Sequence, residues 1–529
     1  MSSSLEAPAQ KHSGQLTAYL YGSLFVLLGL GAIGWLVMSV ASSPAINEVL
    51  QSAAVAGEPP PSLIMAFLTE FGIILPVLVI GLGALSIWLG ARLFTKNIVV
   101  ARWAQSALLW LTIGAGVAIV FNAIELAVSY FAARRTNEAF TAPDQFFALP
   151  ALLVAVAFFA GAYYWLTRRI DIDFQGKEEL NSRQVRSAWN LLIPTLAIFL
   201  IVAARPLEQT LIRSLTDKRF AGQEIPSFVG LENYRNLLST RFDTVGCRID
   251  EATNQCDLAR DGSIRWESID RELLQEGFRT VWTLQVPLID PPLALAISGL
   301  DADFIQSIGT TLLFTVISVA LELLIAMFIA LTVNSAFAGR GLMRAVMLVP
   351  WAIPTVVAAR LWELMLKDTS AGIINRMAMD VGLVDAPQAW LAAASLQLPA
   401  AIMVDVWKTS SFMALLLLAG LQTIPKELYE AASVDGSNRV QQFFSITLPL
   451  LRPTIAVALV FRTLDALRVF DLFNVLFGRQ QLSMATYNYE TLVNNQQDGY
   501  ASAISMIIFI LISVFAIIYV QLLNVETDQ

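Results

Sequence analysis

The sequence predicts an all-α protein that crosses a membrane about ten times, and three observations lead to this fold class. Hydrophobic residues make up 56% of the 529 residues and charged residues only 14%, whereas a soluble domain is about 25% charged. The mean hydropathy is +0.63. Apolar runs of about 20 residues, the length that crosses a bilayer as a helix, recur along the chain. Most of the chain is therefore expected to lie among membrane lipid.

Charge and cysteine content exclude several other classes. A net charge of −8 does not describe a nucleic-acid-binding protein, which is typically basic. One histidine and two cysteines leave no group of metal ligands, so no metal site is expected. The sequence has no GxxxxGK[ST] phosphate loop, so we expect no ATP hydrolysis, no catalytic residue and no cofactor in this chain.

The apolar runs predict ten spans in chain order. The N-terminus is polar, and no small-residue cleavage site lies close behind the first apolar run. Because that run is also long enough to span, it is predicted to be an anchor, with a cleaved signal peptide as the alternative. Arg462, Asp465, Arg468 and Asp471 interrupt the ninth run. The predicted spans are 17–41, 63–91, 104–132, 146–167, 189–212, 304–334, 344–366, 397–421, 453–476 and 501–523.

Lysine and arginine in the short loops predict the orientation, because these residues concentrate on the cytoplasmic side. The loop at 42–62 has none, and the loop at 133–145 has only Arg134 and Arg135. Both termini are therefore predicted to be cytoplasmic. The basic residues of the opposite loops are Arg92, Lys96, Arg102, Arg168, Arg169, Lys177, Arg183, Arg186, Arg340, Arg344, Lys426, Arg439 and Arg452.

On this orientation residues 214–303 form a small extracytoplasmic domain. The segment holds 15 acidic and nine basic residues, and its polarity excludes a simple turn between spans. It also contains both cysteines, Cys247 and Cys256, nine positions apart. An oxidising compartment favours a disulfide between them; two free thiols are the alternative.

A polar stretch at 424–453 interrupts the apolar runs on the predicted cytoplasmic side. Pro425 suits the first turn of a helix, and Gly436 suits a helix end that needs positive φ. The stretch therefore predicts a helix, a tight turn and a second helix whose continuation Pro449 and Pro453 limit. Leu428 and two alanines give the first helix a narrow face with Glu430 beside it.

At this stretch the sequence resembles the permease subunits of ABC importers, whose signature is Glu-Ala-Ala, three residues, Gly, nine residues and Ile-x-Leu-Pro. An ordinary amphipathic loop is the alternative. The resemblance implies that the loop docks on a cytoplasmic ATPase dimer and transmits its closing motion. The matching positions are Glu430, Ala431, Ala432, Gly436, Ile446, Leu448 and Pro449.

The resemblance extends from residue 188 to the C-terminus and is to the maltose-type sugar permeases. It implies a first core helix at 188–213, the domain at 214–303 and the remaining core at 304–529, preceded by an additional region of about four spans at 1–187. Where the family often has Gly-Gly-Pro, this chain has Gly478, Arg479 and Gln480.

The family resemblance also implies a set of partners. These are a second permease subunit, an ATPase dimer that binds ATP and Mg, and an extracytoplasmic sugar-binding protein. The implied cargo is maltose, a maltodextrin, trehalose or another α-glucoside. The implied location is the bacterial inner membrane.

Charged residues inside the predicted spans are costly unless they face protein or water. Asp405 with Lys408, Arg462 with Asp465, and Asp465 with Arg468 have the spacing of helical neighbours. Two hypotheses remain open: pairing that only permits insertion, and a polar face along a translocation pathway. Counting from the family motifs, the resemblance implies pathway positions at Thr355, Asp405, Lys408, Thr409, Phe412, Arg462 and Asp465.

Two other function classes are weighed against transport driven by a partner ATPase. An ion-coupled secondary transporter also needs buried carboxylates, but it has no use for the 424–453 loop. A membrane-embedded glycosyl- or lipid-transfer enzyme needs acids at the extracytoplasmic rim, such as Asp243, Asp250 or Asp257, but no motif supports it.

Overall fold

The computed structural model is predominantly helical and forms two compact units, Met1–Gln209 and Thr210–Gln529. In the described part of the chain nine helices have the length and composition to cross a membrane. A bent pair, Arg340–Ala352 with Thr355–Met365, counts as a tenth span. The described residues are 8–44, 46–47, 49, 63–136, 149–176, 179–222, 226–249, 256–258, 264–267, 274–286 and 293–522.

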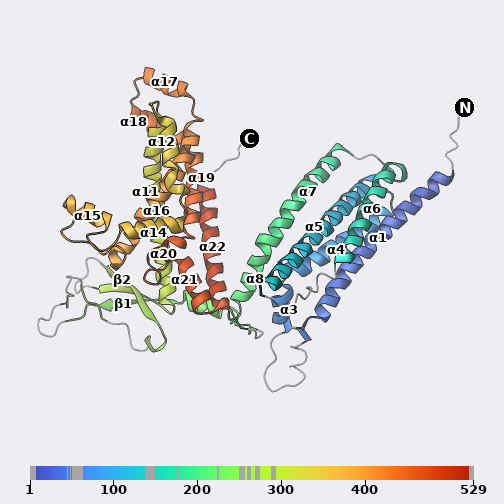
Figure 1. The fold of residues 1–529 in the computed structure, drawn as a ribbon, viewed down its shortest axis with the longest axis horizontal. Coiled ribbons are helices and arrows are strands. Elements are labelled where there is room, and N and C mark those ends of the chain that lie inside the picture. The colour runs from blue at the N-terminus through green and yellow to red at the C-terminus, as the bar shows by residue number, and fades with distance from the viewer. Residues whose placement is uncertain are drawn as a thin grey trace. The chain divides into compact units, whose positions relative to one another are not determined.

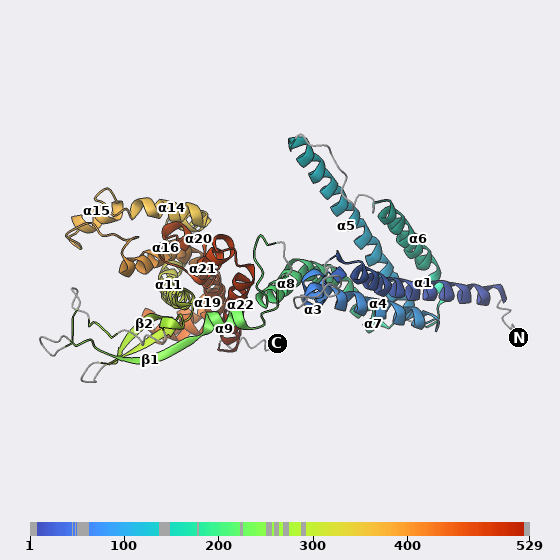
Figure 2. The same ribbon diagram turned by 90° about the horizontal axis from the view of Figure 1, so that it is seen from below.

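The first unit is built from helix pairs. Helix α1 packs along α4, as Figures 1 and 2 show, and α5 packs on α6. Glycines allow the first contact, since a Cβ atom at Gly29 would lie 2.4 Å from the Gly83 carbonyl oxygen. Small residues permit such close approach in membranes, where van der Waals packing holds helices together. The elements are α1 (Pro8–Ala41), α3 (Leu63–Phe71), α4 (Ile74–Leu93), α5 (Ile98–Thr136), α6 (Leu149–Asp173), α7 (Leu180–Phe199), the π-helix η2 (Leu200–Ala204) and α8 (Arg205–Ser214).

The single span predicted over 63–91 is wrong, because α3 and α4 are separated at Gly72. This residue has φ +67°, a conformation that costs glycine little. Arg205 of α8 donates to the Phe71 carbonyl at the end of α3 (2.8 Å), and Glu208 accepts from the Ile73 and Ile74 amides at the start of α4 (2.6 Å for Ile74). The two side chains therefore complement the dipoles of both helix ends.

The second unit places a bundle of long helices between a small sheet and a helical elbow (Figure 1). Helix α11 packs on α16, and α19 contacts both. The helices, including short and π-helical segments, are α9 (Glu232–Leu238), α11 (Ala302–Asn334), α12 (Arg340–Met347), α13 (Val349–Ala352), α14 (Thr355–Met365), α15 (Ile373–Asp380), α16 (Ala394–Leu421), α17 (Lys426–Val434), α18 (Arg439–Gln442), η3 (Phe443–Thr447), α19 (Leu448–Ala466), α20 (Asp471–Leu476), α21 (Met484–Tyr489), η4 (Glu490–Asn494) and α22 (Asp498–Leu522).

The sheet lies within the segment predicted to be extracytoplasmic. Its strands are β1 (Thr240–Gly246), β2 (Arg279–Val286) and β3 (Leu293–Gly299), in the order β1-β3-β2 with antiparallel pairing throughout. Ala294 and Ala296 alternate into its small core. Trp282 of β2 lies against α11 at Gly309, where a Cβ atom would come within 2.4 Å of the indole.

Two further span predictions need correction. The run at 344–366 is not one straight helix but bends by 90° between Ala352 and Thr355. Ile353, the residue before Pro354, has an extended backbone (φ −72°, ψ 128°). A following proline disfavours the helical conformation through steric contact with the residue before it. The run at 453–476 is also not one helix, since α19 ends at Ala466.

The prolines of the 424–453 stretch do not limit the second helix as predicted. From Arg439 the helix continues through the π-helical η3 into α19, giving a span over Arg439–Ala466. Pro449 is the second residue of α19, which follows directly on the π-helical turn η3. Pro453 lies inside α19, and neighbouring helices make such a position tolerable in a membrane.

Candidate functional site: a buried charged cluster and an exposed elbow

Three helices bring ionisable side chains together inside the second unit. Arg462 of α19 donates to both carboxylate oxygens of Glu322 on α11, at 2.5 and 2.7 Å. It also donates to Asp405 of α16 at 3.0 Å and to Asp465, one turn along α19, at 2.5 Å. We call Glu322, Asp405, Arg462 and Asp465 the charged cluster.

The charged cluster is buried at its Glu322 end and exposed at its Asp465 end. The side chain of Glu322 is fully buried and that of Arg462 is 3% exposed, whereas the Asp465 side chain is 68% exposed. Thr409 of α16 donates to Glu322 at 2.7 Å. Burial of a charge is tolerated only when it is paired and hydrogen-bonded. The ion pair with Glu322 therefore fixes the position of the Arg462 guanidinium, and this guanidinium in turn donates to the exposed carboxylate of Asp465.

Four of the seven predicted pathway residues thus meet: Asp405, Thr409, Arg462 and Asp465. Lys408 is half-buried and, among the described residues, makes no ion pair with Asp405. Arg468 turns to the Leu464 carbonyl rather than to Asp465. Of the three predicted intrahelical pairs, Arg462 with Asp465 is therefore the one that the structure contains.

The other two predicted positions lie outside the charged cluster. Thr355 is half-buried at the start of α14, directly after the 90° bend. Phe412 stacks on Trp351 with ring centroids 5.2 Å apart, an arrangement that contributes about 1 kcal/mol beyond burial of the rings. Phe412 therefore has a packing contact in the structure.

Glu322 is the cluster residue that the sequence reasoning missed. It is the only ionisable residue between Asp303 and Arg340, in the middle of an otherwise apolar run. A lone charge at that depth is itself a signal of a functional or paired position. The three-residue spacing used for the other charges could not find it, because its partner Arg462 lies 140 positions away.

The elbow, residues 424–453, presents an exposed helix at the end of the bundle opposite the sheet (Figure 1). Helix α17 has no buried residue, and Glu430 and Ala431 are exposed. Gly436 follows with φ +82°, and Asn438 with Gln441 forms a capping box that starts α18. The predicted turn at Gly436 is therefore present.

Polar contacts join the two helical parts of the elbow to each other. The hydroxyls of Tyr429 and Thr447 lie 2.9 Å apart, and the Gln442 amide donates to Ser433 at 2.9 Å. Ile446 and Tyr429 pack against the main core, while Ala432, Leu448 and Pro449 are half-buried. The signature positions thus divide into an exposed first helix and a second part joined to α19.

At the sheet end, Cys247 and Cys256 form a disulfide with Cα atoms 5.5 Å apart. Ile249 and Cys256 form an antiparallel bridge next to it. The cross-link closes a short loop beside β1, so the pairing proposed from sequence is the one that the structure contains. The elbow and strand β1, which ends directly before Cys247, lie at opposite ends of the second unit (Figure 1).

A bundle of long apolar helices with a buried charged cluster, an exposed elbow and a disulfide-bonded segment beside the sheet is the architecture of a polytopic membrane protein. The family model of the binding-protein-dependent transport system inner membrane component matches residues 322–525. Three relatives extend the match. The first is the trehalose/maltose transport permease MalF of Thermococcus litoralis, 43% identical over 232 residues, or 43% of this chain and 77% of the relative.

The second relative is the sulfoquinovosyl glycerol transport permease SmoG of Agrobacterium fabrum, 35% identical over 43% of this chain and 74% of its own. The third is the trehalose transport permease SugA of Mycobacterium tuberculosis, 30% identical over 64% of this chain and 88% of its own. This chain belongs to the family of binding-protein-dependent transport system inner membrane components. The family resemblance read from the elbow is confirmed, and the chain is a multi-pass inner-membrane protein.

Proposed function

We propose that this chain is one of two permease subunits of an ATP-driven importer for an oligosaccharide of the maltose, trehalose or α-glucoside type. The observation that carries the cargo class is the 43% identity to a trehalose/maltose permease over 77% of its length. The SugA match over 88% of that relative supports the same class.

The charged cluster supplies chemistry that suits such a cargo. Sugar hydroxyls donate to carboxylates and accept from guanidinium or ammonium groups. Asp465 offers an exposed carboxylate beside Arg462, and Lys408 adds a half-buried ammonium group one turn from Asp405. We therefore assign cargo contact to Asp465, Asp405 and Lys408, and positioning of Arg462 to Glu322.

The elbow supplies the coupling. A cytoplasmic ATPase dimer, which binds ATP and Mg, docks on the exposed face of α17 around Glu430. Closure of the ATPase dimer moves the elbow. Because the helix continues from Arg439 to Ala466, this movement also displaces the Arg462 side chain. Both termini then face the cytoplasm, and the disulfide-bonded domain faces the binding protein outside.

Reconstitution tests this function. The chain, a second permease subunit, the ATPase and the binding protein are placed in liposomes, and uptake of radiolabelled trehalose and maltose is measured with and without ATP. We expect ATP-dependent uptake of at least one of the two sugars. Equal uptake without ATP would indicate an ion-coupled transporter instead.

Substitution of Asp465 tests the site within the same assay. Because its side chain is 68% exposed, Asp465→Asn should change the free energy of unfolding by less than about 1 kcal/mol. Loss of a hydrogen bond to a charged group should weaken cargo affinity by about tenfold. Unchanged uptake kinetics would mean that Asp465 only pairs with Arg462.

A further inference from the structure

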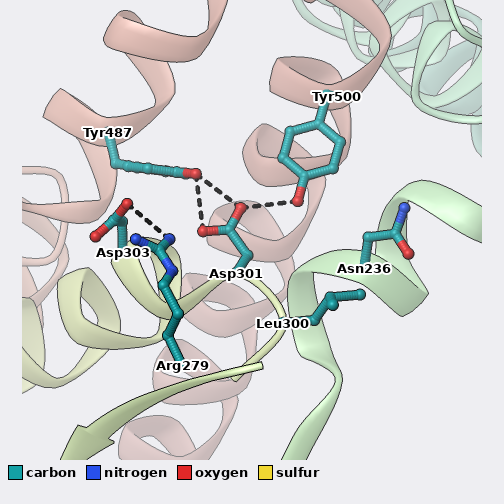
Figure 3. Close-up of a pocket in the computed structure, with 7 residues that line it drawn as sticks. All are labelled: Asn236, Arg279, Leu300, Asp301, Asp303, Tyr487 and Tyr500. Carbon is teal, nitrogen blue, oxygen red and sulfur yellow. Dashed lines mark hydrogen bonds and ion pairs between the residues drawn. The ribbon is translucent and has the colours of Figure 1, made fainter. Parts of the chain in front are cut away.

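A polar pocket lies at the sheet end of the second unit, away from the charged cluster. Its volume is about 350 Å³, at the lower end of the range of ligand pockets, ~300–1,000 Å³. Figure 3 shows side chains from α9, β2, the start of α11, α21 and α22 around it. We call it the outer pocket, and its lining residues are Asn236, Arg279, Leu300, Asp301, Asp303, Tyr487 and Tyr500.

One wall of the outer pocket is fixed by Asp301. Its carboxylate accepts from the Phe304 amide at 3.0 Å, from the Tyr487 hydroxyl at 2.9 and 2.7 Å, and from the Tyr500 hydroxyl at 2.7 Å. Figure 3 shows both hydroxyls converging on it. Burial and the neighbouring carboxylate raise the pKa of Tyr487, so its hydroxyl remains a donor at neutral pH.

The opposite wall keeps unused hydrogen-bonding capacity. In the described part of the chain Asn236 makes no side-chain hydrogen bond. Arg279 and Asp303 pair at 3.1 Å, but their side chains remain 58% and 54% exposed. A guanidinium has five N–H donors and a carboxylate about four acceptor positions. One ion pair leaves most of these free for a ligand.

This set of groups favours a neutral polyhydroxylated ligand. Carboxylate, guanidinium and amide together can donate to and accept from adjacent hydroxyls, while Leu300 offers a small apolar surface. Two carboxylates and one guanidinium leave the outer pocket net negative, which disfavours a sugar acid or a phosphate. The volume accommodates one end of a small saccharide rather than a polymer.

The outer pocket is separate from the charged cluster. Asp301 precedes α11, whereas Glu322 lies on the same helix 21 residues further, or about 30 Å at 1.5 Å per residue. We propose that the outer pocket binds a neutral sugar unit of the cargo through Asn236, Arg279 and Asp303 before the cargo reaches the charged cluster. This inference rests on the proposed sugar-import function.

Trehalose binding to the assembled transporter, without binding protein and without ATP, tests the inference. Saturation-transfer NMR in lipid nanodiscs detects weak contacts and gives an apparent affinity. Each lost hydrogen bond should weaken that affinity about fivefold, so Asn236→Ala and Arg279→Met should each have this effect. Asn236→Ala removes no internal hydrogen bond, so it preserves the fold.

The matched control is Arg241→Met. Arg241 pairs with Asp243 on β1 at 3.2 Å and is similarly exposed, but it does not line the outer pocket. Trehalose affinity should be unchanged in this variant. An equal loss in the control and the pocket variants would overturn the inference.

Uptake of radiolabelled trehalose by the same transporter variants, reconstituted in liposomes with the binding protein and ATP, separates the two proposals. The transporter could import trehalose and yet show no trehalose binding in the NMR experiment, or the same affinity in the parent and both pocket variants. Either result would overturn the proposed binding of sugar in the outer pocket, while the transport function would stand. Absence of ATP-dependent uptake of both trehalose and maltose would overturn the proposed function and this inference with it.

Discussion

At the scale of residues, the charged cluster separates a structural ion pair from exposed functional groups. Glu322 and Arg462 are enclosed, and the bidentate geometry between them is the strong form of an ion pair. Asp465 extends from the same guanidinium to the surface. The charges on α16 and α19 could be found from sequence because they interrupt apolar runs. The Glu322 pairing could not, since its partners lie on different helices.

We expect Glu322→Gln and Arg462→Gln each to lower the free energy of unfolding by about 3–5 kcal/mol, since each leaves a buried charge without its main partner. The double variant should lose clearly less than the sum of the two. Unfolding in SDS titrations of the purified chain measures all three values.

The control for this cycle is the exposed pair Arg360–Glu363, which is 2.6 Å apart on α14. Glu363→Gln should cost less than about 1 kcal/mol because solvent screens the pair. Additive effects for Glu322→Gln and Arg462→Gln would show that the two residues do not act together.

At the scale of elements, hydropathy located the membrane helices but not their breaks. Hydropathy does not show that a helix is interrupted at Gly72 or Pro354. An apolar run that contains a break has the same mean hydropathy as one that forms a single helix. Conversely, Pro449 and Pro453 lie within a helix that tertiary packing sustains. The elbow was predictable, since Gly436 and the family spacing are local signals. The outer pocket was not, because five separate segments form it.

Glu430→Lys should abolish coupling to the ATPase while the chain still inserts. Glu430 is exposed on α17 and, among the described residues, has no side-chain partner, so the substitution disturbs no internal contact. Loss of co-purification with the ATPase, or of transport-linked ATP hydrolysis, measures the effect.

Glu427→Lys makes the same charge change on the same helix, outside the seven signature positions, and should retain most activity. Normal uptake by the Glu430→Lys variant would contradict the docking role of the elbow.

Gly72→Ala should destabilise the junction of α3 and α4 by about 1–3 kcal/mol, because the residue has positive φ. The added Cβ would also lie 2.0 Å from Arg205 Nη1. Hydrogen exchange at the amides of Ile73 and Ile74, which donate to Glu208, should become faster.

Gly81→Ala is the matched control on α4, because a Cβ atom there meets no other atom within 4 Å. It should leave exchange at Ile73 and Ile74 unchanged. Equal exchange in both variants would show that the Arg205–Glu208 pair does not hold this junction.

At the scale of the whole molecule, each unit has its own internal packing, and the second unit has two chemically distinct ends. One end carries the disulfide and the sheet, and the other carries the elbow. The charge bias of the loops predicts opposite sides of the membrane for these ends. Since both native cysteines are disulfide-bonded, single introduced cysteines can report the orientation directly.

A membrane-impermeant maleimide should label Phe242→Cys in intact cells and Val434→Cys only after permeabilisation. Both positions are exposed, at 63% and 88%, so reagent access depends on the compartment. The parent chain should label only after reduction. The opposite pattern for Phe242→Cys and Val434→Cys would reverse the orientation.

The contact of Trp282 with Gly309 has a mechanical consequence. The indole of Trp282 fills the space that a side chain at Gly309 would occupy. Strand β2 therefore cannot slide along α11 at this point unless the indole moves away from the helix. Glu322 lies on the same uninterrupted helix, 13 residues further and about 20 Å along its axis. We therefore expect a displacement of the strands to move α11, the helix that also carries the Glu322 carboxylate paired with Arg462.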